Sequence, residues 1–170
     1  MTEKRQRWTR GAVVAVPLGD GSHTYAQMLD DPEYAFFDCL SRDDLTAAAA
    51  IARPVLFRMW VMRSAHSTGR WSKVGAAPVS AALQVPVRRY NQDPLRPQDI
   101  RLTLHGCDGL LGSPADCDGL ECAAVWNAEH IEDRLRSHYA GVPCKWTLSL
   151  RPKVVTPLHL TGPAPRSRGC

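Results

Sequence analysis

The sequence predicts an α+β fold that is mainly β, arranged as an antiparallel meander or a partly closed barrel, with one prominent C-terminal helix and a short helix near residues 43–53. Three observations support this prediction. Short apolar runs of strand length recur along the first two-thirds of the chain, with turn-forming residues between them. One long segment with helical periodicity begins after Asn127. The 170 residues, 44% of them hydrophobic and 22% charged, suit a single domain with one core.

The first part of the chain contains five segments with the length and composition of β-strands. Turn-forming stretches such as "GDG" at 19–21 and "DDPE" at 30–33 separate them at the spacing of a meander. The segment at 55–62 is expected to be a central strand and the segment at 69–79 an edge strand. The expected strands cover residues 12–18, 23–29, 34–40, 55–62 and 69–79.

A short helix is expected between the third and fourth of these strands. Four consecutive alanines, Ala47–Ala50, favour a helix. Either Asp43 or Asp44 is suited to cap its N-terminus, and Pro54 lies just past its end.

The second part of the chain alternates between predicted loops and predicted strands. Prolines and charges indicate a surface loop at 86–99, and Gly, Asp and Pro indicate another at 108–119. Strands are expected at residues 100–106, 120–126 and 145–152. Residues 1–150 are therefore expected to form a single β-rich domain. Residues 151–170 are expected to be a flexible, Pro-rich tail, because prolines there would interrupt any ladder of β-sheet hydrogen bonds.

The prominent helix is expected to begin after Asn127, a residue type that favours the N-cap, and to end before Gly141. A periodicity of 100° per residue places one apolar row toward the core, formed by Ala128, Ile131, Leu135 and Tyr139. On the polar side, Glu132 and Arg136 are spaced for an i,i+4 ion pair.

The flank of this helix carries His130, Arg134 and His138 at i, i+4 and i+8. A guanidinium in this position can hold phosphoryl oxygens, and a histidine with a pKa near 6.5 can transfer a proton. We identify these three residues as catalytic candidates. The alternative is that they are solvated, or paired with a neighbouring strand.

Asp38 and three tryptophans complete the candidate site. Asp38 follows aromatic residues, which could raise its pKa for work as a base, or it could simply bond to backbone or to an arginine at a strand end. The indole rings of Trp60, Trp71 and Trp126 are candidates for binding an aromatic ligand, with core packing as the alternative.

Composition narrows the class of partner and the location. No apolar stretch approaches the roughly 20 residues of a membrane span, and the apolar run near the N-terminus is too short for a signal peptide, so we expect a cytoplasmic protein without a membrane partner.

The net charge of +4 comes from scattered basic residues, and nucleic-acid binding is not expected. The six cysteines lack the paired spacing of a zinc site, so we expect reduced thiols, no metal site and no cofactor, while metal dependence stays open.

Whole segments of the chain resemble the Immunity protein 26 family, which also contains a small phosphotriesterase of the HocA type. The resemblance covers about Arg10 to Leu150. It rests on the runs "GAVVAVPLGDGSHTYAQML", "VLFRMWV", "GRWSKVGAAPV" and "GLECAAVWNAEHIEDRLRSHYAG". It implies two different functions, because most members look like immunity proteins that bind and silence a cognate toxin, whereas the HocA-type branch implies hydrolysis of organophosphate triesters.

Between these two functions, we predict the phosphotriesterase acting on a small-molecule organophosphate substrate. The mild positive charge fits poorly with an inhibitor of a nuclease, whose phosphate-binding surface is basic. In this hypothesis Arg134 stabilises the phosphoryl oxygen and His130 acts as general base. The alternative is a non-enzymatic immunity protein whose partner is a protein toxin.

Overall fold

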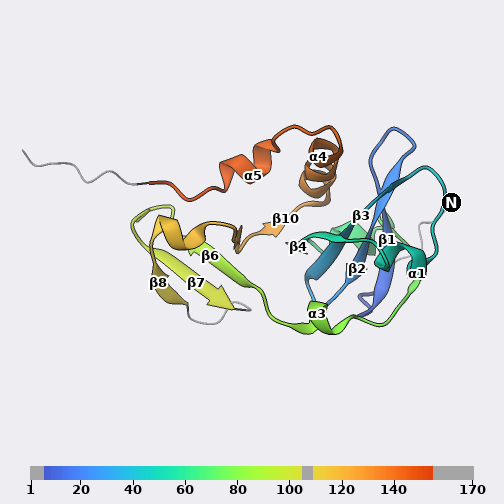
Figure 1. Ribbon diagram of the computed structural model, residues 1–170, viewed down its shortest axis with the longest axis horizontal. Coiled ribbons are helices and arrows are strands. Elements are labelled where there is room, and N and C mark those ends of the chain that lie inside the picture. Colours follow the sequence, from blue (N-terminus) through green and yellow to red (C-terminus); the bar gives the residue numbers. More distant parts are fainter. Residues whose placement is uncertain (1–5, 105–108, 155–170) are drawn as a thin grey trace, which may run out of the picture.

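The computed structural model describes residues 6–104 and 109–154 and shows two β-sheets with short helices packed around them (Figure 1). The predicted class, α+β and mainly β, is confirmed, and the strands within these two ranges do not close into a barrel.

The larger sheet has six strands and is built on the predicted meander. It comprises β1 (Ala12–Pro17), β2 (His23–Met28), β3 (Glu33–Ser41), β4 (Val55–Val61), β5 (Ser72–Ala76) and β10 (Val125–Trp126), in the spatial order β10-β4-β3-β2-β1-β5. Strands β1 to β4 pair antiparallel in succession, so that Ala26 lies between Val14 and Phe36. All five strands predicted in the first part of the chain are confirmed, and β5 is an edge strand as expected.

The smaller sheet has four strands in the order β8-β7-β6-β9, which are β6 (Arg88–Gln92), β7 (Ile100–Leu104), β8 (Leu110–Gly112) and β9 (Glu121–Cys122). Two loop predictions are wrong here. The segment at 86–99 contains β6, and the segment at 108–119 contains β8 and the 3-10 helix Pro114–Cys117. The strand predicted at 120–126 is divided, since β9 pairs with β6 while β10 pairs with β4.

In the described part of the chain, five short α-helices connect and cover the sheets. They are α1 (Ala47–Ile51), α2 (Ser64–Ser67), α3 (Ala81–Gln84), α4 (Ala128–Tyr139) and α5 (Lys145–Ser149). The predicted short helix is confirmed as α1, although its cap is Thr46, whose Oγ1 accepts from the amide of Ala49 at 3.2 Å. The closing strand predicted at 145–152 is wrong, because α5 occupies this segment. Each of these helices falls short of the length and apolar character that a membrane-spanning segment requires.

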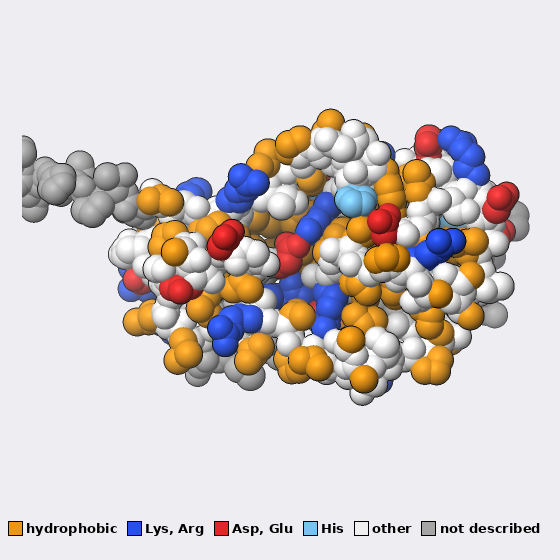
Figure 2. All heavy atoms as spheres, viewed as in Figure 1, with side chains coloured by type: hydrophobic (Ala, Val, Ile, Leu, Met, Phe, Trp, Pro, Cys, Tyr) orange, Lys and Arg blue, Asp and Glu red, His pale blue; other side chains and the backbone are white. Residues whose placement is uncertain are grey.

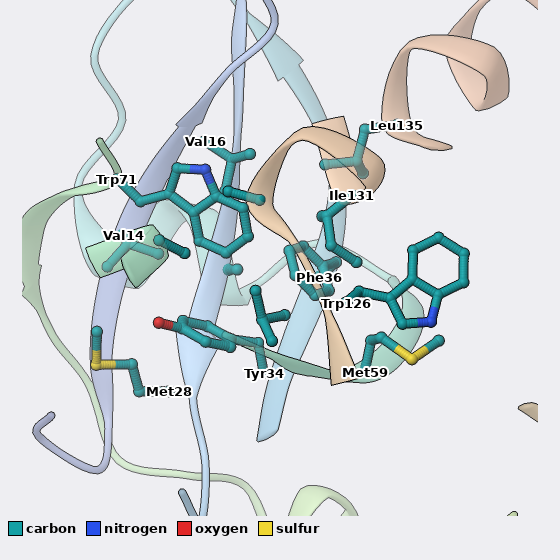
Figure 3. Close-up of a cluster of buried hydrophobic side chains, with 14 of the residues drawn as sticks. Val14, Val16, Met28, Tyr34, Phe36, Met59, Trp71, Trp126, Ile131 and Leu135 are labelled. Carbon is teal, nitrogen blue, oxygen red and sulfur yellow. The ribbon is translucent and has the colours of Figure 1, made fainter. Parts of the chain in front are cut away.

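Alternate residues of the larger sheet enter two cores, as the pleat of a strand requires. One core lies between the sheet and α4, where Tyr34, Phe36 and Trp71 pack against Ile131 (Figure 3). The other includes Val13, Tyr25, Ala35 and Phe37, covered by Ala47 and Ala50 of α1. The larger sheet is thus buried on both faces, which makes it a rigid support for whatever α4 and the smaller sheet present.

The structure confirms most of what the sequence predicts for helix α4. Ala128, Ile131 and Leu135 are buried and Tyr139 is partly buried. At the C-terminus the amides of Gly141 and Val142 bond back to the carbonyls of His138 and Ser137, and the φ of +67° at Gly141 is the left-handed conformation that this Schellman motif needs.

The expected ion pair between Glu132 and Arg136 is wrong. Glu132 is buried and accepts hydrogen bonds from Arg70 Nε at 2.7 Å and Trp71 Nε1 at 2.9 Å. Arg136 bonds to Asp133 instead, at 2.6 Å. Glu132 therefore faces the larger sheet rather than solvent.

The predicted division into a domain at 1–150 and a tail at 151–170 stays a prediction. Residues 151–154 have no helix or strand, and the rest of the predicted tail lies outside the described residues.

Candidate functional site

A groove of about 530 Å³ opens between the two sheets. Three segments line it, namely residues 55–58 of β4, residues 86–89 at the start of β6, and residues 119–121 leading into β9. In Figure 2 this face of the molecule is hollowed near its middle, and basic side chains gather in the hollow with acidic ones beside them.

A buried cluster of one acid and two arginines connects the sheets behind the groove. Glu33, the first residue of β3, is 3% exposed. Its Oε1 accepts from Arg89 Nη2 at 2.7 Å and its Oε2 from Arg58 Nη2 at 2.8 Å. The guanidinium of Arg89, 2% exposed, also donates to the carbonyl of Arg58 and lies 5.0 Å from the ring centroid of Trp60. Because Arg89 belongs to β6 and Glu33 to β3, this ion pair joins the smaller sheet to the larger one.

Arg134 of the predicted catalytic row joins α4 to the same groove. Its Nη2 lies 2.5 Å from Glu121 Oε1 and its Nη1 lies 3.2 Å from Oε2, a bidentate pair. The guanidinium stacks 3.8 Å above the ring centroid of Phe57, and the side chain is 15% exposed. Arg134 is therefore held by a carboxylate on one side and an aromatic ring on another, and its charge is largely compensated.

The two histidines of the row face other partners. The ring of His130 stacks on Trp146 of α5, with centroids 3.7 Å apart and planes at 25°. His138 Nε2 lies 3.8 Å from Asp38 Oδ1 on β3, and both side chains are close to half exposed, at 45% and 46%. The structure thus brings His138 and Asp38 together, as neighbours on the surface, while His130 and Arg134 each contact a different element.

Helix α5 is fixed to α4 beside His130. Trp146 Nε1 donates to Asp133 Oδ2 at 2.9 Å. The hydrogen bonds from Arg136 and Trp146 hold the pKa of Asp133 below its usual value, since both stabilise the ionised carboxylate. These contacts fix the apolar ring of Trp146 against the row.

The three tryptophans occupy different environments. Trp71 is completely buried in the core, where its indole N–H bonds to Glu132. Trp126 is 3% exposed and borders a second depression of about 840 Å³, beside α5. Trp60 is partly buried against Arg89. Trp71 and Trp126 both belong to the core between the larger sheet and α4, in line with the alternative of core packing.

The remaining features of the site depend on contacts that sequence reasoning missed. Glu33 and Arg89 carry no local signal, because they are 56 residues apart, and Glu121 lies outside the helix that carries its partner Arg134. Within residues 6–104 and 109–154, no three His, Cys, Asp or Glu side chains come together as a metal ion would require.

Comparison with known proteins bears on the predicted activity. The sequence model of a protein family, described as Immunity protein 26, matches residues 9–101 of this chain. These residues include β1 to β6 but not α4. Comparisons with curated proteins and with solved structures found no match.

The match overturns the prediction of an enzyme. It is to a family of immunity proteins, and nothing in the comparisons supports the HocA-type branch. The predictions of a hydrolase, of phosphotriesterase activity and of an organophosphate substrate are therefore wrong. The hydrolytic roles assigned to His130, Arg134, His138 and Asp38 depended on that activity. Since the matched residues make up more than half of its 170, the chain belongs to the Immunity protein 26 family.

Proposed function

We propose that this chain is an immunity protein, which binds a cognate protein toxin and blocks it by occupying its surface. The family match over residues 9–101 carries this proposal. The matched part holds most of the larger sheet and β6, so it includes the two strands, β4 and β6, that flank the groove.

The geometry of the groove supports binding rather than chemistry. Arg58, Arg89 and Arg134 are each fixed by a carboxylate at 2.8 Å or less. Side chains that are already immobilised lose little conformational entropy when a partner docks, and this favours affinity. A catalytic group must instead gain or lose a proton or contact a reacting atom, which these mutual ion pairs oppose.

The surface beside the groove is accessible to a large partner. His138 and Asp38 are each close to half exposed, and the hollow is open on the face shown in Figure 2. We propose that these two residues belong to the contact surface, and that the toxin approaches from this side.

The charge of the chain indicates which toxin surface it complements. The net charge is +4, and complementary fields accelerate the encounter of two proteins and disfavour wrong partners. A basic phosphate-binding surface, as on a nuclease, would be repelled. The toxin surface that this chain covers is therefore acidic.

Growth rescue tests the proposal directly. Each gene that neighbours the gene for this chain is expressed alone in a bacterial host, and any product that stops growth is then expressed together with the chain. We expect one such product, with growth restored by this chain and not by an Ile131→Asp variant, in which a charge in the core prevents folding. The complex should also survive size-exclusion chromatography. If no neighbouring product is toxic, or if the chain fails to restore growth, the proposed function is wrong.

A further inference from the structure

The groove between the sheets has more positive than negative charge. Among the described residues, its lining contains Arg58, Arg88 and Arg89 against one acid, Glu121. The lining thus has an excess of two positive charges. Two further side chains, Glu33 and Arg134, pair with this lining; they add one charge of each sign, so the excess stays at two.

Arg88 carries the part of this excess that a partner can reach. It is exposed at the first position of β6, and it forms no ion pair with any residue that the structure describes. Its neighbour Arg89 points the other way, into the buried pair with Glu33. Among the residues that the structure describes, Arg88 is therefore the cation of the groove with no compensating carboxylate.

Arg58 adds an unused donor at the back of the groove. Its side chain is 10% exposed, its Nη1 donates to the carbonyl of Val85 and its Nη2 to Glu33. Its Nε has no hydrogen-bond partner in the part of the chain described. Buried polar groups are nearly always paired, so an unpaired N–H on this lining residue adds to the positive potential that an incoming anion would meet.

Apolar side chains lie between these charges. Val55, 42% exposed, and the exposed Pro86 border the groove together with the partly buried Leu120. A volume of about 530 Å³ lies within the range of roughly 300–1,000 Å³ typical of ligand sites, and suits a few side chains of a polypeptide rather than a whole domain surface. The combination fits a segment that presents carboxylates beside apolar groups.

We propose that this groove receives an acidic segment of the toxin, with a carboxylate placed against Arg88. The proposal rests on the proposed function and names the chemistry of its partner. A second copy of this chain is disfavoured as the occupant, because both copies carry a net charge of +4.

Charge reversal at two matched arginines tests the groove. Arg88 and Arg101 are both exposed, lie on adjacent antiparallel strands of the smaller sheet, and differ in that only Arg88 lines the groove. Calorimetry with the toxin identified by growth rescue should show Kd raised by about tenfold or more for Arg88→Glu and changed by less than about threefold for Arg101→Glu. The affinity of the unchanged chain should fall as salt rises, and this dependence should be weaker for Arg88→Glu.

The outcomes separate this inference from the proposed function. If the unchanged chain binds the toxin but the two variants bind equally well or equally poorly, the groove is not the site, although the chain remains an immunity protein. If the unchanged chain binds no toxin, the proposed function fails. Circular dichroism and thermal unfolding of both variants should match the unchanged chain, because neither arginine has a described partner.

A second measurement requires no toxin. A short peptide of alternating glutamate and leucine, and its counterpart with lysine in place of glutamate, are titrated into the isotope-labelled chain. The acidic peptide should shift the amide resonances of residues 55–58, 87–89 and 119–121, and Arg88→Glu should abolish these shifts while Arg101→Glu retains them. Shifts that the lysine peptide reproduces, or shifts confined to other residues, would overturn the proposed groove.

Discussion

Removing the charge of Glu33 should destabilise the whole protein. The substitution Glu33→Gln preserves the shape of a side chain that is 3% exposed, but it leaves the guanidinium of Arg89, 2% exposed, without a carboxylate. Breaking a buried ion pair from one side costs about 3–5 kcal/mol. Since a typical domain is stable by about 5–15 kcal/mol, this loss is a large fraction of the total. For a chain of this length it corresponds to a fall in Tm of about 6–20 °C.

Thermal and urea denaturation followed by circular dichroism measure this effect. The matched control is Glu129→Gln, which removes the same charge from a side chain 61% exposed that pairs with Arg70 on the surface, and it should cost no more than about 1 kcal/mol. Adding Arg89→Met to Glu33→Gln should recover part of the loss, because it removes an uncompensated cation. Should Glu33→Gln and Glu129→Gln melt within about 2 °C of each other, the buried pair would not hold the sheets together as argued.

Three further effects follow from local geometry. Burial, and secondarily the charge of Lys73, lowers the pKa of His66, so the unfolded chain takes up a proton that the folded protein resists. The free energy of unfolding should therefore decrease as the pH falls below about 6.5, and pH titration of His66→Gln should show a flatter dependence. Gly141→Ala should cost about 1 kcal/mol in urea denaturation, and Gly141→Asn less, because the φ of +67° strains a Cβ that otherwise meets no atom within 4 Å. Thr46→Ala should cost about 1 kcal/mol by the same assay, while Ser80→Ala, at a helix start without a side-chain cap, should cost almost nothing.

The larger sheet could be predicted because the residues that specify each of its main strands lie within that strand and the turns beside it. Each strand from β1 to β4 is an apolar run bounded by strong turn formers, and consecutive strands pair with one another. Helix α4 could be predicted equally well, because a cap residue, a regular apolar row and Gly141 mark it in the sequence.

The smaller sheet and α5 could not be found in this way. The polar run of β6 resembles a loop until Arg89 is seen to pair with Glu33, 56 residues earlier. In α5 the alternation of Trp146, Thr147 and Leu148 imitates a strand, yet the segment is helical, with Trp146 stacked on His130 and bonded to Asp133. Both errors arise because tertiary contacts decide the structure of a short segment whose own propensity is weak.

The charge on α4 shows why spacing alone suggested catalysis. Periodicity correctly placed Arg134 on the flank of the helix, but spacing does not reveal which charges are already compensated. Glu132 is bound by Arg70, Asp133 by Arg136, and Arg134 by Glu121. In these three ion pairs the nitrogen and oxygen atoms are 2.5–2.7 Å apart and partly buried. Such a pair fixes the orientation of its two side chains, and neither charge is free to attract a ligand from solution. The charges that can select a partner are therefore those that the internal pairs leave exposed. The proposed recognition of a toxin should for this reason be measured at the exposed Arg88 of β6 rather than at the row on the helix.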